Sequence, residues 1–398
     1  MKRLFIASVL VALALGGQRV SAQGYPPANY DESLIPAYEL PDPLFFADGK
    51  PVKNRRQWNR KRRAEVLEVF ASEMYGHVPA APEGLHFKVL SEEKVYDGLG
   101  LRRNVRIFLD AAEQHWFDVL VHLPAGARKP VPVFVGLNFW SNPGTLDKRE
   151  SWRWPYEMIL RSGFGVATAW RDGIEPDGKN AKILDDVPLP SDGGVRAWYN
   201  RGSDWGAISA WAWGLSRIAD YLTTDRSVGA LAVIGHSRLG KTALWAAAND
   251  LRFELAVSNC SGSCGAAISR RVIGESFAII DSRFPHWFCR NFDKYKGAED
   301  TFPADQHWLA ALAAPRPLYI ASATLDRWAD PRGEWLCAKA VEPVYRLFGK
   351  KGLALDDMPA ADTPDSAGDI AYHIRTGKHD LTAWDWEQYL DFAARHLR

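Results

Sequence analysis

The chain of 398 residues carries 49 basic and 48 acidic side chains, which leaves a formal net charge of +1 at pH 7. A balance of this kind creates no strong field that would attract nucleic acid or an anionic membrane surface, and we expect neither as a partner. Hydrophobic residues make up 47% of the chain, so it can bury a large core.

The first residues are typical of a secretory signal peptide. Lys2 and Arg3 precede an apolar run over residues 4–15, and Val20-Ser21-Ala22 supplies the small residues of a cleavage site. The run is too short for a membrane-spanning helix, and no stop-transfer pattern follows it. We therefore expect residues 1–22 to be removed and the mature protein to be secreted or periplasmic, with no membrane insertion after cleavage.

Export would place the four cysteines in an oxidising compartment, where they could form one or two disulfides. The sequence does not determine how Cys260, Cys264, Cys289 and Cys337 would pair. None of them belongs to a zinc-like pair, and the chain has no H-E-x-x-H motif, so we expect no metal.

The N-terminal part predicts a lead-in, a helix and three antiparallel strands. Residues 24–50 are rich in proline and polar side chains and are expected to be extended, whereas residues 55–74 predict a helix. Residues 85–90, 103–109 and 116–123 follow with strand-like alternation, and glycines separate the first two.

Beyond residue 130 the pattern changes to short apolar runs that alternate with helical segments. The predicted strands are 131–137, 165–169, 230–234, 255–258, 317–321 and 370–374, and the predicted helices are 203–222, 240–249, 333–347 and 383–396. This order predicts a mostly parallel sheet with helices on both faces. Because no linker divides the chain, we expect residues 23–398 to form a single α/β domain with insertions at about 138–162 and 171–201, which are expected to build the substrate site.

The sequence around Ser237 indicates a nucleophile on a sharp turn. An apolar run ends at Gly235, and His236, Ser237 and Arg238 follow before a helical stretch begins at Gly240. Strand, tight turn and helix are the context of the nucleophile elbow, in which the serine hydroxyl is exposed above the sheet. Here the second glycine comes one position late. The alternative role for Ser237 is that of a simple helix N-cap.

A nucleophilic serine needs a base and an acid, which follow it in the order acid then histidine in α/β-hydrolases. His379 lies in the predicted last strand-to-helix loop, where an imidazole can reach the elbow. His373 would lie inside the last strand and His396 at a helix end, which favours structural roles for both. Asp326 follows the penultimate strand and is the predicted acid, with Asp330 as the alternative.

From about residue 30 the chain resembles the glucuronoyl esterases of carbohydrate esterase family 15, of the bacterial type. The motifs that carry the resemblance are GHSRLGK (235–241), GESF (274–277), FPHWFCRNFDKY (284–295), DQHWLAALAAPRPLYIASATLDRWADPRGEW (305–335) and GKHDLT (377–382). The resemblance implies an α/β-hydrolase, without metal or cofactor, that cleaves the ester between 4-O-methyl-glucuronic acid side groups of xylan and lignin alcohols. Its partner would be a glucuronoxylan or lignin–carbohydrate ester, and we expect a monomer.

The resemblance also implies roles for four further residues. Arg238 would help to form the oxyanion hole, and Lys241 would contact sugar hydroxyls. Glu275 and Trp328 would hold the uronate ring. The structural alternatives are surface solvation for Lys241 and Glu275, and core packing for Trp328.

One departure from the fungal members concerns the triad acid. They carry a glutamate in a Q-E-S-G stretch, whereas residues 259–262 here read Asn-Cys-Ser-Gly. This difference favours Asp326 as the acid and leaves Cys260 without an expected role. The fungal cysteine before the nucleophile is His236 here, and no convincing counterpart of the family's ring-binding glutamine precedes Glu275.

Two other functions remain open from the sequence. An acetyl-xylan esterase could use the same scaffold. A non-catalytic carbohydrate-binding protein is suggested only by the 17 tryptophans, whose rings can stack on sugars.

Overall fold

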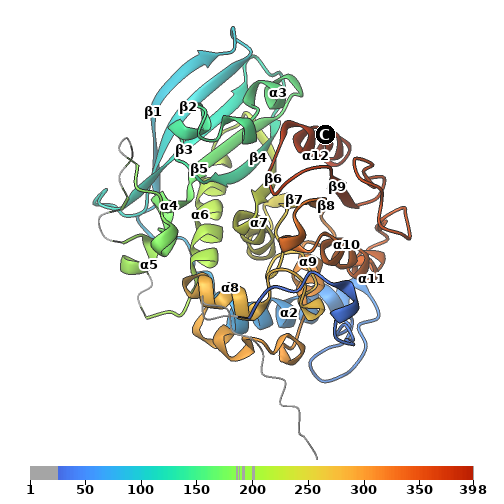
Figure 1. Ribbon diagram of the computed structural model, residues 1–398. Helices are drawn as coiled ribbons and strands as arrows, with labels where there is room; N and C mark the ends of the chain where they lie inside the picture. The colour runs from blue at the N-terminus through green and yellow to red at the C-terminus, as the bar shows by residue number, and fades with distance from the viewer. Residues whose placement is uncertain (1–25, 185–186, 188, 191–192, 200–201, 398) are drawn as a thin grey trace, which may run out of the picture.

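The computed structural model describes residues 26–184, 187, 189–190, 193–199 and 202–397 (Figure 1). The predicted signal peptide and parts of the predicted 171–201 insertion lie outside the described residues. No helix within the described part of the chain is both long and apolar enough to span a bilayer.

Nine strands form one sheet in the order β1-β2-β3-β5-β4-β6-β7-β8-β9. The strands are β1 His86–Val95, β2 Gly100–Phe108, β3 Trp116–Pro124, β4 Val131–Asn138, β5 Gly165–Trp170, β6 Val228–His236, β7 Phe253–Asn259, β8 Leu318–Ala323 and β9 Ile370–Arg375. The pairs from β1 to β5 are antiparallel, and all pairs from β5 to β9 are parallel. The predicted fold class, an α/β-hydrolase with antiparallel N-terminal strands, is confirmed.

Helices cover both faces of the sheet, as predicted (Figure 1). Their bounds are α1 Arg55–Gln57, α2 Arg63–Phe70, α3 Tyr156–Arg161, α4 Arg171–Ile174, α5 Val195–Trp198, α6 Ala207–Leu222, α7 Arg238–Asn249, α8 Phe277–Arg283, α9 Gln306–Ala311, α10 Pro331–Ala340, α11 Glu342–Arg346 and α12 Ala383–His396. The two faces have separate apolar cores because neighbouring residues of a strand point in opposite directions. In β6, Leu231 and Val233 join the core of α6 and α7, whereas Ala232 and Ile234 join that of α3 and α12.

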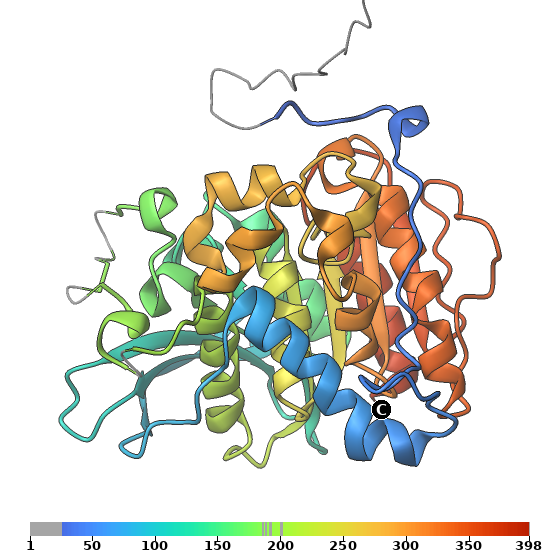
Figure 2. The same cartoon turned by 90° about the horizontal axis from the view of Figure 1, so that it is seen from below.

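The helix α6 is buried along almost its whole length, including its polar residues Ser209, Ser216 and Arg217. The segment from residue 55 to 75, which contains α2, lies outside α6 and α7 (Figure 2). The predicted helix start at residue 203 is wrong, since α6 begins at Ala207. The N-cap residue, Gly206, has an extended backbone and packs directly on the Trp287 backbone. A Cβ at this position would lie 1.9 Å from the carbonyl oxygen of Trp287, so only glycine fits before the helix begins.

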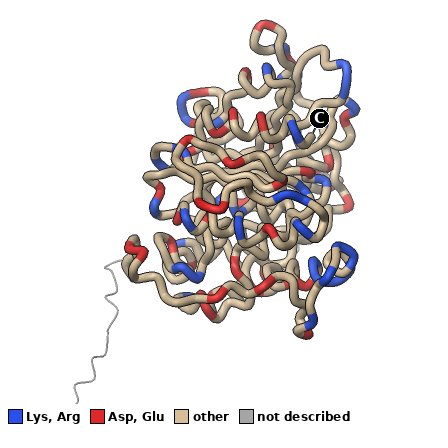
Figure 3. The backbone as a smooth tube through the Cα atoms, turned by 90° about the vertical axis from the view of Figure 1, so that its right-hand side faces the viewer, with Lys and Arg blue, Asp and Glu red and all other residues tan. Residues whose placement is uncertain are grey.

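Two further predictions need correction. The predicted helix 333–347 is divided into α10 and α11, since Pro343 supplies no N–H to continue the hydrogen-bond ladder. The disulfides that the sequence left possible are not formed: all four cysteines are buried as free thiols. Acidic and basic residues are interspersed along the backbone, in agreement with the balanced charge (Figure 3).

Candidate active site

Ser237 occupies a strained turn between β6 and α7. Its φ of 59° and ψ of −128° lie in a region that residues other than glycine rarely adopt. A Cβ at Gly235 would lie 1.8 Å from the carbonyl oxygen of Leu239, so only glycine permits this close approach of strand and helix. Gly240, the late second glycine, is less tightly enclosed, with its nearest neighbour 3.0 Å from an added Cβ.

The geometry argues against a simple capping role for Ser237. The residue stands at the N-cap position of α7, yet its side chain makes no capping hydrogen bond. Its backbone N–H donates to the carbonyl oxygen of Asn259 at 2.9 Å, which fixes the turn on the end of β7. The strained turn thus sets the position of the Ser237 side chain, and its hydroxyl is not used to cap α7, as in a nucleophile elbow.

His379 and Asp326 meet at the same edge of the sheet. The distance from Nδ1 of His379 to Oδ2 of Asp326 is 2.6 Å, and the Asp326 side chain is 3% exposed whereas that of His379 is 40% exposed. The His379 ring lies 4.5 Å, between centroids, from the ring of His236, the neighbour of Ser237. Among the described residues no hydrogen bond joins the Ser237 hydroxyl to His379, and such bonds are often long in unliganded enzymes.

The loop that carries His379 is anchored from several directions. Arg375 donates to the carbonyl oxygens of Lys378 and Asp380 at 3.0 and 3.1 Å, and its guanidinium pairs with Asp385. The Asp380 carboxylate accepts hydrogen bonds from Trp152 and Arg153 of the 138–162 insertion. The imidazole is therefore presented by a rigid support.

The alternative acid and the alternative histidines have other partners. Asp330 accepts hydrogen bonds from the guanidinium of Arg271 and from the N–H of Gly333, so it caps α10. His373 is buried and contacts Asp385 and Tyr319. His396 lies at the end of α12 and contacts the carbonyl oxygen of Gly368.

Cys260 lies beside this pair, so that its Sγ, an Asp326 oxygen and a His379 nitrogen are within 4.8 Å of one another. Three such groups could hold a metal ion. Burial, however, raises the pKa of the Cys260 thiol well above its usual value, which opposes the thiolate that a metal requires.

Arg238 follows the serine and is enclosed by aromatic rings and one carboxylate. Its guanidinium carbon lies 4.7 Å from the ring centroid of Trp287 and 5.2 Å from that of Phe284, and Nη1 donates to Asp177. Burial lowers the pKa of Arg238, but the Asp177 charge opposes this shift, and the side chain keeps its charge at neutral pH.

Lys241, Glu275 and Trp328 are linked to one another. The Nζ of Lys241 lies 3.3 Å from Oε2 of Glu275 and donates to the carbonyl oxygen of Ser261 at 2.5 Å. The N–H of Glu275 donates to the carbonyl oxygen of Trp328 at 3.0 Å. Lys241 and Glu275 are nearly buried, at 3% and 8% exposure, whereas Trp328 is half-buried. Lys241, Glu275 and Trp328 are thus joined by hydrogen bonds into one group, which we call the wall. The burial of Lys241 and Glu275 excludes simple surface solvation for these two residues.

Glu334 is fully buried near the carboxyl ends of β7 and β8. Its carboxyl accepts hydrogen bonds from the Ser322 hydroxyl at 2.6 Å and from the Gly262 N–H at 2.9 Å, and so joins the ends of β7 and β8. Burial, together with the charge of Asp326, raises the pKa of Glu334 to about 8.

The replacement Glu334→Gln is expected to make stability less dependent on pH. The folded protein binds the Glu334 proton more tightly than the unfolded chain, whose glutamate has a pKa near 4.5, so the free energy of unfolding falls as pH rises through this window. Glutamine carries no proton that titrates there. Thermal denaturation at about pH 5 and about pH 9 should show a smaller loss of Tm in the variant than in the wild type. An equal loss in both proteins would contradict the raised pKa.

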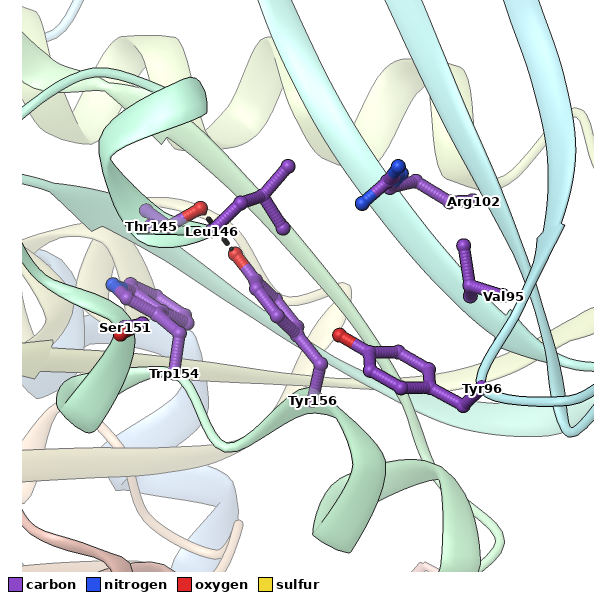
Figure 4. A pocket seen from close by; sticks show the side chains of 8 residues that line it. All are labelled: Val95, Tyr96, Arg102, Thr145, Leu146, Ser151, Trp154 and Tyr156. Atoms are coloured by element: carbon purple, nitrogen blue, oxygen red, sulfur yellow. Dashed lines mark hydrogen bonds between the residues drawn. The ribbon is translucent and has the colours of Figure 1, made fainter. Parts of the chain in front are cut away.

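A cavity of about 390 Å³ lies elsewhere, between the β1–β2 turn and the 138–162 insertion (Figure 4). It is lined by Val95, Tyr96, Arg102, Thr145, Leu146, Ser151, Trp154 and Tyr156. The Tyr156 hydroxyl donates to Thr145 at 2.6 Å, and Arg102 reaches in from the opposite side. None of the predicted catalytic residues lines this cavity.

The fold and the site together define a class of protein. A parallel sheet presents a serine on a strained elbow at the carboxyl end of a strand, and a hydrogen-bonded histidine–aspartate pair on the loops after two neighbouring strands. This is the arrangement of an α/β-hydrolase.

Comparisons with known proteins identify the family. The model for "Glucuronyl esterase, fungi" matches residues 191–349. Carbohydrate esterase MZ0003, from an unknown prokaryotic organism, is 42% identical over 93% of this chain and 92% of its own length. The solved glucuronoyl esterase from Solibacter usitatus is 42% identical, with a TM-score of 0.83 over 92% of this chain and 100% of that one. The chain belongs to the glucuronoyl esterases of carbohydrate esterase family 15, bacterial type, and is a carboxylic ester hydrolase.

A more distant relative has a name that specifies a substrate. The 4-O-methyl-glucuronoyl methylesterase 1 of Wolfiporia cocos is 29% identical over 85% of this chain and 79% of its own length.

Several residues of the site could not be identified from the sequence. Asp177 lies in a polar insertion and meets Arg238 only in the folded chain. His286 and Trp287 stand in a motif that carries the family resemblance, but their common partner, Asp177, is more than a hundred positions away. Glu334 resembles an ordinary helix residue until its burial is known.

Proposed function

We propose that Ser237, His379 and Asp326 hydrolyse the C6 ester of a glucuronic or 4-O-methyl-glucuronic acid unit attached to xylan, and release a lignin alcohol. His379 accepts the Ser237 proton as the hydroxyl attacks the ester carbonyl, and then protonates the departing alcohol. Water, activated by the same imidazole, releases the free uronate from the acyl-enzyme. Asp326 holds the ring of His379 and stabilises its charged form.

The observation that carries the proposal is the hydrogen bond of 2.6 Å between His379 and Asp326 beside the strained Ser237 elbow. Arg238 follows Ser237 directly, where a guanidinium and the N-terminus of α7 can stabilise an oxyanion. Lys241, Glu275 and Trp328 supply a cation, a carboxylate and an indole, which suit the hydroxyls and ring of a uronate. The names of the relatives support the same ester.

Substrate choice tests this assignment against acetyl-xylan hydrolysis. We expect benzyl and methyl glucuronate to be hydrolysed with a larger kcat/KM than acetylated xylan, because only a uronate can use the wall of Lys241, Glu275 and Trp328. Initial rates on the three substrates measure this preference. A preference for acetyl groups would contradict the proposed role of the wall, while leaving the ester hydrolase chemistry intact.

We further propose that the protein is exported and acts on plant cell-wall polymer outside the cytoplasm, as the N-terminal sequence predicts. Mass spectrometry of the mature protein from its natural host tests this, with an N-terminus at Gln23 as the expected result. A protein that retains residues 1–22 would contradict it.

A further inference from the structure

Asp177 is a buried carboxylate on which four side chains converge. Its Oδ2 accepts hydrogen bonds from Arg171 at 2.7 Å and from Arg238. Its Oδ1 accepts from His286 Nε2 at 2.9 Å and from Trp287 Nε1 at 2.6 Å. The Asp177 side chain is 0% exposed, and the bonds from Arg171 and Trp287 are fully buried. Asp177 therefore connects the end of β5, the elbow and the segment after α8.

The partners of Asp177 keep its carboxyl group ionised. Burial alone would raise the pKa of this carboxyl, but the hydrogen bond from His286 and the charges of Arg171 and Arg238 outweigh that effect and lower the pKa below its usual value. A permanently ionised, buried acceptor holds an arginine more firmly than a neutral one, because charge-assisted hydrogen bonds are roughly twice as strong.

The guanidinium of Arg238 contacts a carboxylate and two aromatic rings, and one of its N–H groups has no partner among the described residues. Asp177 holds Nη1, and the stacked rings of Phe284 and Trp287, with centroids 3.9 Å apart, lie beside the guanidinium. Its Nε is buried and has no hydrogen-bond partner among the described residues. The Arg238 side chain as a whole remains 22% exposed, so part of the guanidinium can still face a ligand.

We propose that Asp177 is the positioning residue for Arg238. By holding Nη1, it orients the plane of the guanidinium so that the remaining donors meet the ester oxygen that becomes negative when Ser237 attacks. This inference rests on the proposed function, in which Arg238 stabilises that oxygen. Asp177 itself contacts no reacting atom.

A purely structural role for the Asp177 carboxylate is the alternative. The insertion has a separate clamp, however, since the Asp172 carboxylate accepts hydrogen bonds from the N–H groups of Asp177 and Lys182 at 2.9 and 3.0 Å. This clamp uses only the backbone of Asp177. The loop therefore has an anchor that does not depend on the Asp177 carboxylate, although that carboxylate also accepts hydrogen bonds from Arg171, His286 and Trp287.

Chemical rescue distinguishes the two roles. The replacement Arg238→Ala leaves a space between Asp177, Phe284 and Trp287 that matches a free guanidinium ion. We expect this variant to lose about 10²- to 10³-fold in kcat on benzyl glucuronate. Guanidinium chloride at non-denaturing concentration should restore about tenfold or more of that loss. In the double variant Asp177→Asn/Arg238→Ala the same salt should restore nothing. Equal rescue with and without Asp177 would overturn the inference.

A double-mutant cycle gives a second readout. Asp177→Asn alone should lower kcat about 10- to 100-fold with a smaller change in KM, and should change kcat less than about twofold when Arg238 is already alanine. Asp177→Glu, which keeps the charge but moves the carboxylate, should also lower kcat, and it replaces the asparagine variant if that does not fold. Additive losses would overturn the inference.

The matched control is Asp250→Asn. Asp250 also pairs with an arginine, Arg252 at 2.6 Å, but it follows α7 at the end opposite to Ser237. On its own, Asp250→Asn should lower Tm without changing kcat. Combined with Arg238→Ala, it should leave the rescue by guanidinium unchanged. The failures are distinguishable. A normal kcat in Asp177→Asn would overturn only the positioning role, and a normal kcat in Arg238→Ala would overturn the oxyanion role. Activity that survives the loss of Ser237 would overturn the proposed function.

Discussion

Replacing Ser237 by alanine is expected to lower kcat for methyl or benzyl glucuronate by about 10⁶-fold. The loss should be this large because Ser237 combines a strained elbow with a histidine–aspartate pair at the same edge of the sheet. The residual rate would come from Arg238 and substrate binding alone. Single-turnover kinetics with the purified variant measure the effect.

The fold of the Ser237→Ala variant provides the control. The elbow has its φ of 59° for backbone reasons, and the serine side chain makes no capping bond, so the variant should keep a Tm close to that of the wild type. A loss of kcat smaller than about tenfold would exclude Ser237 as the nucleophile.

Replacing Asp326 by asparagine is expected to lower kcat by about 10⁴-fold. The carboxylate accepts a hydrogen bond from Nδ1 of His379 at 2.6 Å, which leaves Nε2 unprotonated to act as the base. An amide at this position can donate to Nδ1 and favour the wrong tautomer. The pH profile of kcat for each protein, measured with benzyl glucuronate, should show the loss at every pH where the wild type is active.

Asp330→Asn is the matched comparison, four positions further along the chain. Asp330 pairs with Arg271 at 2.7 Å and caps α10, so its loss should lower Tm. We expect kcat to change by less than about threefold, since Asp330 has no contact with His379. If Asp330→Asn lost as much kcat as Asp326→Asn, the assignment of the acid would be wrong.

The order of strands and helices was predictable because each element has a strong local pattern. The strands β4 to β9 appear as short apolar runs, and the structure extends them by one or two residues at an end, except that β8 starts one residue later than predicted. The errors arose where tertiary contacts decide. The start of α6 depends on the close approach of Gly206 to Trp287, which no local pattern reveals.

The candidate site was predictable in part for the same reason. Ser237 follows β6 directly and His379 lies four residues after β9, and the carboxyl ends of parallel strands meet at one edge. Asp177 was not predictable, because its partners at 171, 238, 286 and 287 are brought together only by folding. The free cysteines show a further limit: composition and compartment allow disulfides, but whether two thiols meet is decided by the fold, which leaves all four cysteines buried and unpaired with one another.

Covalent labelling tests the central claim most directly. Treatment of the active enzyme with a fluorophosphonate, followed by peptide mass spectrometry, should place one phosphonate on Ser237. The label should be slowed by excess glucuronate ester and nearly abolished in His379→Ala. A fully active enzyme that is labelled at another serine, or that remains unlabelled at Ser237, would contradict the account.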